Sequence, residues 1–411
     1  MAKTENTMAK REKRIADVVA LKTPDRVPFA PKIGVAYSHV GMIDMYEALM
    51  DFRNMREGVE RFVTRWETDL FWSPAGYPSN MMEVLGTSYI NWPGATKNLS
   101  LDSGFQITDQ EFMSFEEYDE LIENPAHFFM TKVFPRKHAK LKGLEKLSFN
   151  NVVEFGHFAS MAVFADPEVR ATLLTLMHAG DEALKWLSAT QELCKIALDN
   201  ETPLGCIVGQ GAPYDMLADN IRGFLNVPMD KLEHPEKVLA AIDVMTRIGV
   251  RNVDGIKAAG LKYCFMPLHG GTDDFMSDED YKKFYWPSLR KVIERQLELG
   301  ITPYILFEGK YNTRLDAIRD IPPGKAIYMF EQVDIVQAKK DLGDVACVAG
   351  NLSSTLLAFG KKEEIVDATK RMIDECAPGG GFIMDCFIVL ENFKHENMDA
   401  WFEATMEHGK Y

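Results

Sequence analysis

The sequence lacks paired cysteines, long apolar runs and an excess of positive charge, and each absence excludes a class of protein. No Cys-x-x-Cys pair occurs among the six cysteines, so neither a small disulfide-rich fold nor a zinc-ribbon spacing is expected. No apolar run approaches the length that spans a bilayer. The net charge of −15 at pH 7 argues against a nucleic-acid partner and against an anionic membrane surface.

The amino-terminal segment 1–14 is rich in positive charge, but no apolar stretch follows it, so we expect no secretory signal. Single cysteines in a chain of 411 residues are typical of reduced thiols, which predicts a cytoplasmic protein. Most of these thiols should be small core side chains, and Cys386 alone is expected to reach solvent. The six are Cys194, Cys206, Cys264, Cys347, Cys376 and Cys386.

Short apolar runs that alternate with helical patterns organise the chain. From residue 261 to the end, five such runs are each followed by a helix, which implies a parallel sheet. Three earlier runs, 27–35, 69–77 and 203–213, bring the number of strands to about eight, enough to close a barrel. We therefore predict an α/β protein with one (β/α)8 TIM barrel over residues 1–411. Helices are expected at 5–21, 42–66, 166–200, 214–260, 278–299, 312–320, 334–342, 353–376 and 390–408.

Residues 78–150 do not follow this pattern. The segment has no clear period and contains Trp92, Pro93 and several phenylalanines, which is typical of an insertion or lid over a barrel mouth. A separate packing subdomain is the alternative. The run at 150–158 would add one more strand, with His157 facing a pocket.

Polar side chains stand where the late strands end. Because parallel barrel strands deliver their chemistry at their carboxyl ends, these side chains are the candidate site. A Glu, a His and a Cys from separate strands form a donor set suited to zinc, although each group could merely satisfy its own strand end. The strand ends are His269, Glu308, Glu331, Gly350 with Asn351, and Asp385 with Cys386.

The order of motifs resembles the uroporphyrinogen decarboxylase superfamily, whose fold is a (β/α)8 barrel. The resemblance covers nearly the whole chain and is weakest over 78–150. It depends on TPDRVP before the first strand, on IVGQGAPYDMLADNIRG, on VAGNLSSTLL, and on GGGFIMDCF followed by ENMDAW. The superfamily includes both the decarboxylase and cobalamin-dependent methyltransferases, so the resemblance by itself does not decide the reaction.

Departures from the decarboxylase pattern are informative. The decarboxylase has an arginine-containing segment at its first strand that meets substrate carboxylates, whereas here Lys32 is the only nearby cation. The decarboxylase's tyrosine in the helix after the third strand corresponds to Asp219 of this sequence. The histidine of its Gly-His-Gly turn, late in the chain, corresponds to Cys386. The resemblance therefore argues against an eight-carboxylate porphyrinogen as the substrate.

The thiol-methylating members of the superfamily bind zinc through a His-x-Cys pair on the fifth strand and a Cys on the eighth. Here Glu308 stands in the Cys position of that pair, the His is missing, and Cys386 matches the last ligand. An oxygen-containing donor set resembles instead the substrate-side methyltransferases of anaerobic O-demethylases. The resemblance then implies methyl transfer from a methoxylated, aromatic ether to a corrinoid.

That resemblance assigns roles to particular residues. Zinc held by Glu308, Cys386 and His269 would act as a Lewis acid on the ether oxygen; without the metal, His269 or Glu331 would serve as the general acid. The chain shows no Asp-x-His-x-x-Gly segment to ligate cobalamin, so we expect a corrinoid protein as partner, docked at the barrel mouth. Substrate contacts are expected from Tyr37, Trp72, Asp219, Phe307 and Phe330.

Other interpretations stay open at this point. Lys32 with Asp219 could serve the decarboxylation of a smaller carboxylic acid, which would release carbon dioxide without cobalamin. A methylcobamide-dependent methyltransferase to another acceptor, or a non-catalytic protein that binds a corrinoid partner, are further alternatives. The resemblance is also compatible with a homodimer.

Overall fold

A ring of parallel segments forms the centre of the computed structural model, which describes residues 7–95, 99–148, 157–205 and 209–411. Five parallel strands pair in the order β3-β4-β5-β6-β7. In register, Leu268 lies beside Phe307 and Phe307 beside Phe330, so the carboxyl ends of β3, β4 and β5 are level. The strands are β3 Tyr263–Leu268, β4 Thr302–Phe307, β5 Ile327–Phe330, β6 Cys347–Ala349 and β7 Phe382–Ile383.

Three extended segments complete the ring through isolated parallel bridges. Phe29 bridges Met384 beyond β7, Phe71 bridges Leu204, and Gly209 bridges Phe265 of β3. The amide of Asp69 donates to the carbonyl of Phe29 at 2.8 Å, which joins the first segment to the second. Eight segments therefore close a barrel, and the predicted (β/α)8 fold is confirmed.

The first half of the ring is less regular than the predicted strands at 27–35 and 69–77. Only single bridges form there, and no ladder is continuous. Pro28 and Pro31 lie in the first segment and have no backbone N–H to donate, which interrupts a ladder at those positions. The predicted strand at 150–158 lies mostly outside the described residues, and His157 begins the short helix α9, His157–Ser160.

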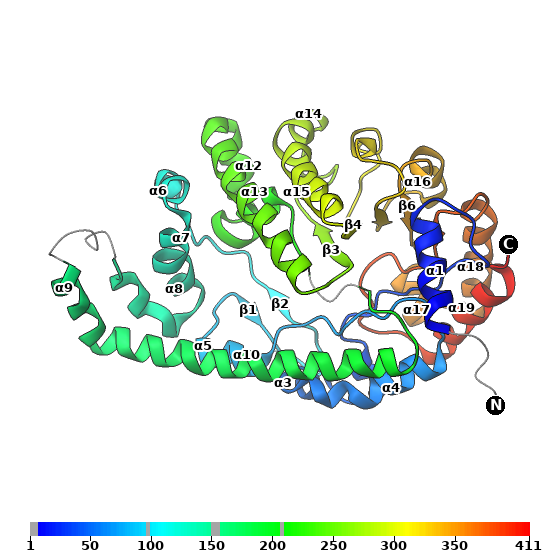
Figure 1. The fold of residues 1–411 in the computed structure, drawn as a ribbon, viewed down its shortest axis with the longest axis horizontal. Helices are drawn as coiled ribbons and strands as arrows, with labels where there is room; N and C mark the ends of the chain where they lie inside the picture. The colour runs from blue at the N-terminus through cyan, green and yellow to red at the C-terminus, as the bar shows by residue number, and fades with distance from the viewer. Residues whose placement is uncertain (1–6, 96–98, 149–156, 206–208) are drawn as a thin grey trace.

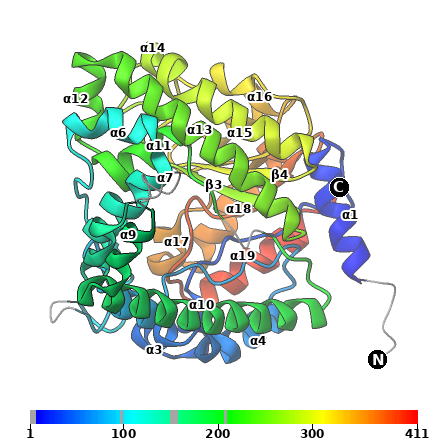
Figure 2. The same cartoon turned by 60° about the vertical axis from the view of Figure 1, so that its left-hand side comes forward.

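Helices surround the ring, as Figures 1 and 2 show for α13, α15 and α16. Within the described ranges, no helix combines the length and apolar character needed to cross a bilayer. In chain order they are α1 Thr7–Val19, α2 Tyr37–Gly41, α3 Met45–Met50, η1 Phe52–Met55, α4 Arg56–Arg65, α10 Pro167–Asp199, α11 Pro213–Leu217, η6 Ala218–Arg222, α12 Asn226–Glu233, α13 Pro235–Ala258, α14 Asp278–Asp280, η7 Tyr281–Tyr285, α15 Trp286–Glu298, η8 Ala317–Arg319, α16 Ile335–Leu342, α17 Ser354–Phe359, α18 Lys362–Cys376 and α19 His395–His408.

Several predicted helices differ in detail. The pattern at 312–320 forms only the short 3₁₀ helix η8. The reason is Arg314, whose buried guanidinium donates to the carbonyls of Gly271 and Met276 and thereby holds this segment against the loop after β3. The helix predicted at 353–376 is interrupted at Gly360, which ends α17.

The segment 78–150 is mostly helical rather than irregular. Part of it lies against the helix after the third barrel segment: the amide of Phe112 donates to the carbonyl of Ile221 at 2.8 Å, and Arg222 donates to the carbonyl of Met113. This places the insertion beside η6, the helix that carries Asp219. Its elements are α5 Ser79–Leu85, β1 Ile90–Asn91, β2 Gln106–Ile107, η2 Phe115–Glu117, α6 Tyr118–Glu123, α7 Pro125–Phe128, η3 Phe129–Val133, α8 Phe134–Lys137 and η4 Ala139–Lys146, with η5 Met161–Ala165 following α9.

One buried carboxylate joins the amino-terminal helix to the ring. Asp69 is fully buried and accepts hydrogen bonds from Arg14 at 2.5 Å, from Arg26 at 2.7 Å and from the amide of Phe29 at 2.8 Å. Removing one partner of a buried ion pair leaves the other charges without compensation.

We therefore expect Asp69→Asn to lower the free energy of unfolding, measured by urea denaturation, by about 3–5 kcal/mol. The control is Asp243→Asn, which breaks an exposed pair with Arg247 one helical turn away and should cost about 1 kcal/mol or less. Equal losses in the two variants would contradict the role given to Asp69.

Candidate functional site

Three side chains meet at the carboxyl ends of β3 and β4. His269 follows β3 and Glu308 follows β4 in register, while Asp219 comes from η6. The Nδ1 atom of His269 lies 2.6 Å from Oδ2 of Asp219, and its Nε2 atom lies 3.4 Å from Oε2 of Glu308. Both ring nitrogens thus face carboxylates, an arrangement that favours the doubly protonated imidazolium.

The electrostatics of this cluster keep His269 charged. Burial alone would lower the pKa of His269, but the hydrogen bonds to Asp219 and then Glu308, together with the charge of Asp215, raise it to about 11. The ring is nevertheless 41% exposed, so a ligand at the barrel mouth can reach it. At neutral pH His269 is therefore a charged donor held between two acceptors.

Asp215 holds the turn that carries His269, and the sequence pattern did not reveal it as a site residue. Its buried carboxylate accepts from the amides of His269 and Gly270, each at 3.0 Å, and from the hydroxyl of Tyr285 at 2.6 Å. A Cβ at Gly270 would lie 2.8 Å from the ring of Tyr214, so only glycine fits there. The spacing of Asp215 and Asp219, one helical turn apart, was the signal that could have revealed the pair.

Glu331, predicted as an alternative general acid, contacts the turn that follows Glu308. One carboxylate oxygen accepts from the amide of Gly309 at 2.5 Å. Gly309 has a φ of +79°, a conformation that other residues rarely adopt. Glu331 thereby stabilises the turn that follows Glu308 and fixes where that carboxylate points.

Cys386 is fully buried, so the prediction that it reaches solvent is wrong. Its thiol lies 3.3 Å from Oδ1 of Asp385 and 3.7 Å from the carbonyl of Lys32. Burial, and next the charge of Asp385, raise the pKa of the Cys386 thiol well above its ordinary value. Zinc binds the thiolate, and these surroundings favour the protonated thiol. The described cysteines, Cys194, Cys264, Cys347, Cys376 and Cys386, are all buried and form no disulfide.

The predicted zinc ligands are therefore not arranged as a zinc site. In the described part of the chain, no three His, Cys, Asp or Glu side chains gather closely enough to hold a metal ion. His269 already has a carboxylate at each ring nitrogen, and the Cys386 thiol is engaged with Asp385. The donor set Glu308, His269 and Cys386 does not fit the metal, and no step below depends on it.

Trp72 and Lys32 line the interior of the ring. The Trp72 ring packs edge-on against Tyr304 at 4.7 Å, and Nζ of Lys32 lies 4.8 Å from the Trp72 ring and over Phe265. The hydroxyl of Tyr304 donates to Asp385 at 2.6 Å. Trp72 is buried in the barrel interior, and its role as a substrate contact stays a prediction.

The other aromatic candidates lie elsewhere. Tyr304 faces the barrel interior, so alternation along β4 places Glu308 on the same side and Phe307 on the opposite one. Phe307 stacks on Phe330 at 5.0 Å and, with Tyr311 and Tyr328, forms a fully buried aromatic cluster. Both phenylalanines are core residues and not substrate contacts.

Tyr37 is also fully buried. Its hydroxyl donates to the carbonyl of Trp72 at 2.7 Å, and its ring packs against Phe62 and Phe71. Tyr37 therefore supports the segment that carries Trp72, and it does not line the site.

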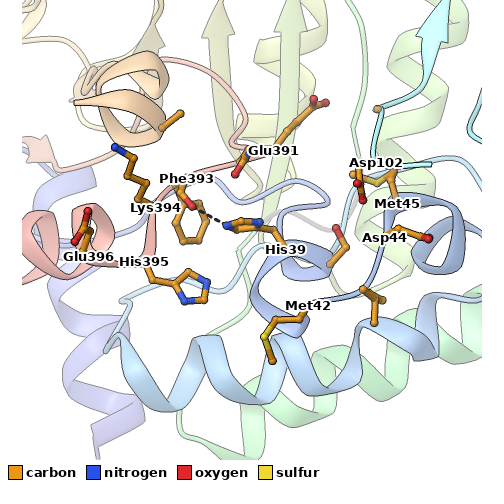
Figure 3. A pocket seen from close by; sticks show the side chains of 15 residues that line it. His39, Met42, Asp44, Met45, Asp102, Glu391, Phe393, Lys394, His395 and Glu396 are labelled. Atoms are coloured by element: carbon orange, nitrogen blue, oxygen red, sulfur yellow. Dashed lines mark hydrogen bonds between the residues drawn. The ribbon is translucent and has the colours of Figure 1, made fainter. Parts of the chain in front are cut away.

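A pocket of about 990 Å³ opens at the same end of the barrel (Figure 3). Its walls come from the stretch after the first barrel segment, from the insertion and from the segments that follow β6 and β7: Ser38, His39, 42–45, Asp102, Gly104, Ala358 and 391–396. Nε2 of His39 donates to the carbonyl of Phe393 at 2.7 Å, and the His395 ring lies 5.4 Å from the His39 ring. None of the residues predicted for the site lines this pocket.

The charge of His269 can be measured directly. In protein carrying ¹⁵N-histidine, we expect the His269 ring to be doubly protonated at pH 8, and Asp219→Asn to lower its pKa toward the ordinary value of about 6.5. The folded-state pKa exceeds the unfolded one, so the proton's contribution to stability is complete below about pH 6.5 and is lost as the pH rises toward 11. A neutral ring at pH 8 in the wild-type protein would contradict the ion-pair arrangement.

Comparisons with known proteins agree with the barrel fold. The family model described as "Uroporphyrinogen decarboxylase (URO-D)" matches residues 158–408. A uroporphyrinogen decarboxylase of Chlorobium phaeobacteroides is 23% identical over 205 residues, 47% of this chain and 56% of its own. One of Pelobacter propionicus is 26% identical over 181 residues, 43% of this chain and 52% of its own. The chain thus spans about half the length of the curated relatives it matches.

A solved methyltransferase from Methanosarcina mazei has the same fold. It superposes with a TM-score of 0.63 over 97% of this chain and 98% of its own, at 16% identity. The matched family segment contains β3 to β7 and the residues Asp215, Asp219, His269 and Glu308, which form the cluster at the barrel rim. Because the match covers more than half of the chain, the protein belongs to the uroporphyrinogen decarboxylase family.

Proposed function

We propose that the protein is a methyltransferase that removes a methyl group from a methoxylated, aromatic ether and passes it to a corrinoid carried by a partner protein. The observation that carries the proposal is the Asp219–His269–Glu308 cluster, in which the histidine ring lies between two carboxylates at the mouth of a barrel and is charged at neutral pH. Family membership and the fold shared with a methyltransferase support it.

Cleavage of a methyl ether needs a nucleophile that attacks the methyl group and a group that stabilises the negative charge on the departing oxygen. The reduced cobalt of the corrinoid supplies the nucleophile, with both electrons of the new bond. The electron pair of the broken C–O bond stays on the oxygen, and the imidazolium of His269 lies where it can stabilise that charge. The acid role that the sequence pattern gave to zinc thus falls to His269.

The pKa of His269 suits a phenolate leaving group. At about 11, it lies within about one unit of a phenol, whose pKa is about 10. The departing phenolate then pairs with the charged ring and shares its proton, without needing a strong acid. Asp219 orients the ring through its hydrogen bond with Nδ1. The contact between Nε2 and Glu308 is longer, at 3.4 Å, so Nε2 is the nitrogen that can donate to a substrate.

The test is release of a phenol from a methoxylated aromatic in the presence of Co(I) cobalamin, followed by chromatography. We expect His269→Gln to lower kcat by about 10²–10⁴. Asp219→Asn should reduce the rate more at pH 9 than at pH 7. In this variant the pKa of His269 is lower than in the wild type, so the ring has lost its proton at pH 9. His178→Gln, on the exposed face of α10, is the matched control and should have wild-type activity.

Two outcomes would overturn the assignment. No turnover with a broad panel of methoxylated aromatics would count against the methyl donor class. One zinc per chain that is lost in Glu308→Gln, measured by elemental analysis, would return the acid role to a metal.

Decarboxylation of a small carboxylic acid is a second candidate, because Lys32 places a cation among the aromatic rings of the barrel interior. Such a cation would hold a carboxylate. Carbon dioxide release without cobalamin, abolished in Lys32→Met and retained in His269→Gln, would favour this reaction over methyl transfer.

A further inference from the structure

A cavity of about 590 Å³ opens at the end of the barrel that lies opposite to the His269 cluster. Tyr263 and Thr302, which are neighbours in register at the starts of β3 and β4, form part of its wall. His269 and Glu308 follow the other ends of the same two strands. The cavity is therefore separate from the site described above, although it shares two strands with it.

The position of α1 leaves room for this cavity. Arg14 donates to Asp69 at 2.5 Å, and Arg11 donates to the carbonyl of Glu201 at 2.9 Å. These bonds hold α1 against the chain just before the second and third barrel segments. The last turn of α1, which includes Val19, forms one wall of the cavity, so a space remains between this turn and the starts of β3 and β4.

The walls of the cavity are mainly apolar. Ile301 is almost fully buried, and Val19 and Leu297 are half-buried against the hydrophobic core. At Gly300, where φ is +71°, an added Cβ would meet no atom within 4 Å, so the backbone there borders open space. Tyr263 is the one aromatic residue among the described residues of the wall. The wall therefore offers contacts to methylene groups more than to stacked rings.

Both charged side chains that line the cavity are cationic, although the chain has a net charge of −15. They are Lys262, which pairs with Glu12 at 2.9 Å, and Lys325, which makes no ion pair within the described ranges. No carboxylate belongs to the described residues of the wall. A carboxylate that a ligand brings to this wall would meet a lysine and no like charge.

We propose that this cavity binds an aliphatic carboxylic acid of medium chain length. The chain lies against Val19, Leu297 and Ile301, where each methylene group removed from water favours binding, and the carboxylate pairs with Lys325. Apolar walls with a small number of polar groups are typical of sites for small molecules. The proposal does not depend on methyl transfer, because no member of the Asp219–His269–Glu308 cluster lines the cavity.

The test is titration calorimetry of the full-length protein with octanoate, together with its melting temperature. We expect a single site and a melting temperature that rises with the octanoate concentration, because a ligand that binds only the folded state stabilises it. Octan-1-ol has the same chain without the charge and should bind about fivefold more weakly, since an ion pair near the surface contributes modestly. 4-Phenylbutanoate should also bind more weakly than octanoate.

Three variants locate the ligand. Lys325→Gln should weaken the binding of octanoate to the level of octan-1-ol and leave octan-1-ol unaffected. The matched control is Lys291→Gln, at an exposed lysine of α15 that does not line the cavity, and it should bind octanoate as the wild type does. Ala20→Trp, at an exposed position of the wall, should fill the space and abolish binding of both compounds, with circular dichroism confirming that the variant is folded.

The contrary outcomes are equally specific. Octanoate that produces neither heat nor a rise in melting temperature would overturn the proposal. Equal octanoate affinities in Lys325→Gln and Lys291→Gln, or unchanged binding in folded Ala20→Trp, would do the same, and tighter binding of 4-phenylbutanoate would overturn the aliphatic assignment. Because these residues lie outside the His269 cluster, failure of the proposed function would not affect this test.

Discussion

The position of the charged ring of His269 depends on one buried carboxylate. Asp215 accepts two backbone amides from the turn after β3 and a hydroxyl from Tyr285. Burial, and next the negative charge of Asp219, raise the pKa of Asp215, so the ionised form is costly unless these donors and the imidazolium compensate it. The turn, the ring and the second carboxylate therefore stabilise one another, and none of them is independent of the others.

The barrel keeps two polar layers apart. At the rim, Asp219, His269 and Glu308 are partly exposed and face the mouth. Deeper in the ring, Asp385 accepts from Tyr304 and from the amides of Lys32 and Cys386. The deeper layer is buried and satisfied, so it shapes the interior, whereas the rim has donors that a ligand can reach. Cys386 belongs to the buried layer and His269 to the rim, although both follow barrel strands.

The fold could be predicted because its signals are local. Apolar runs followed by helical patterns identified β3 to β7, and the helix predicted over 166–200 is α10, where the Asp166 carboxylate accepts from the amides of Glu168 and Val169. The irregular first half of the ring was harder to predict. Prolines lack the backbone N–H that a ladder needs, but they leave the apolar pattern of the sequence unchanged. Glu308, His269 and Asp219 were candidates from the sequence, but Asp215 was missed because a buried aspartate next to a helix start looks like an ordinary first-turn residue.

Sequence alone determined which strands end in chemically useful groups, since strand order and parallel pairing place every carboxyl end on one rim. Only the tertiary structure decided which of those groups meet. Phe307 and Glu308 are adjacent in the chain and point to opposite sides of β4, and Cys386 ends a strand yet is enclosed by Asp385 and Lys32. The direction of a side chain and its access to water depend on neighbours that are far away along the chain, so a one-dimensional pattern does not contain them.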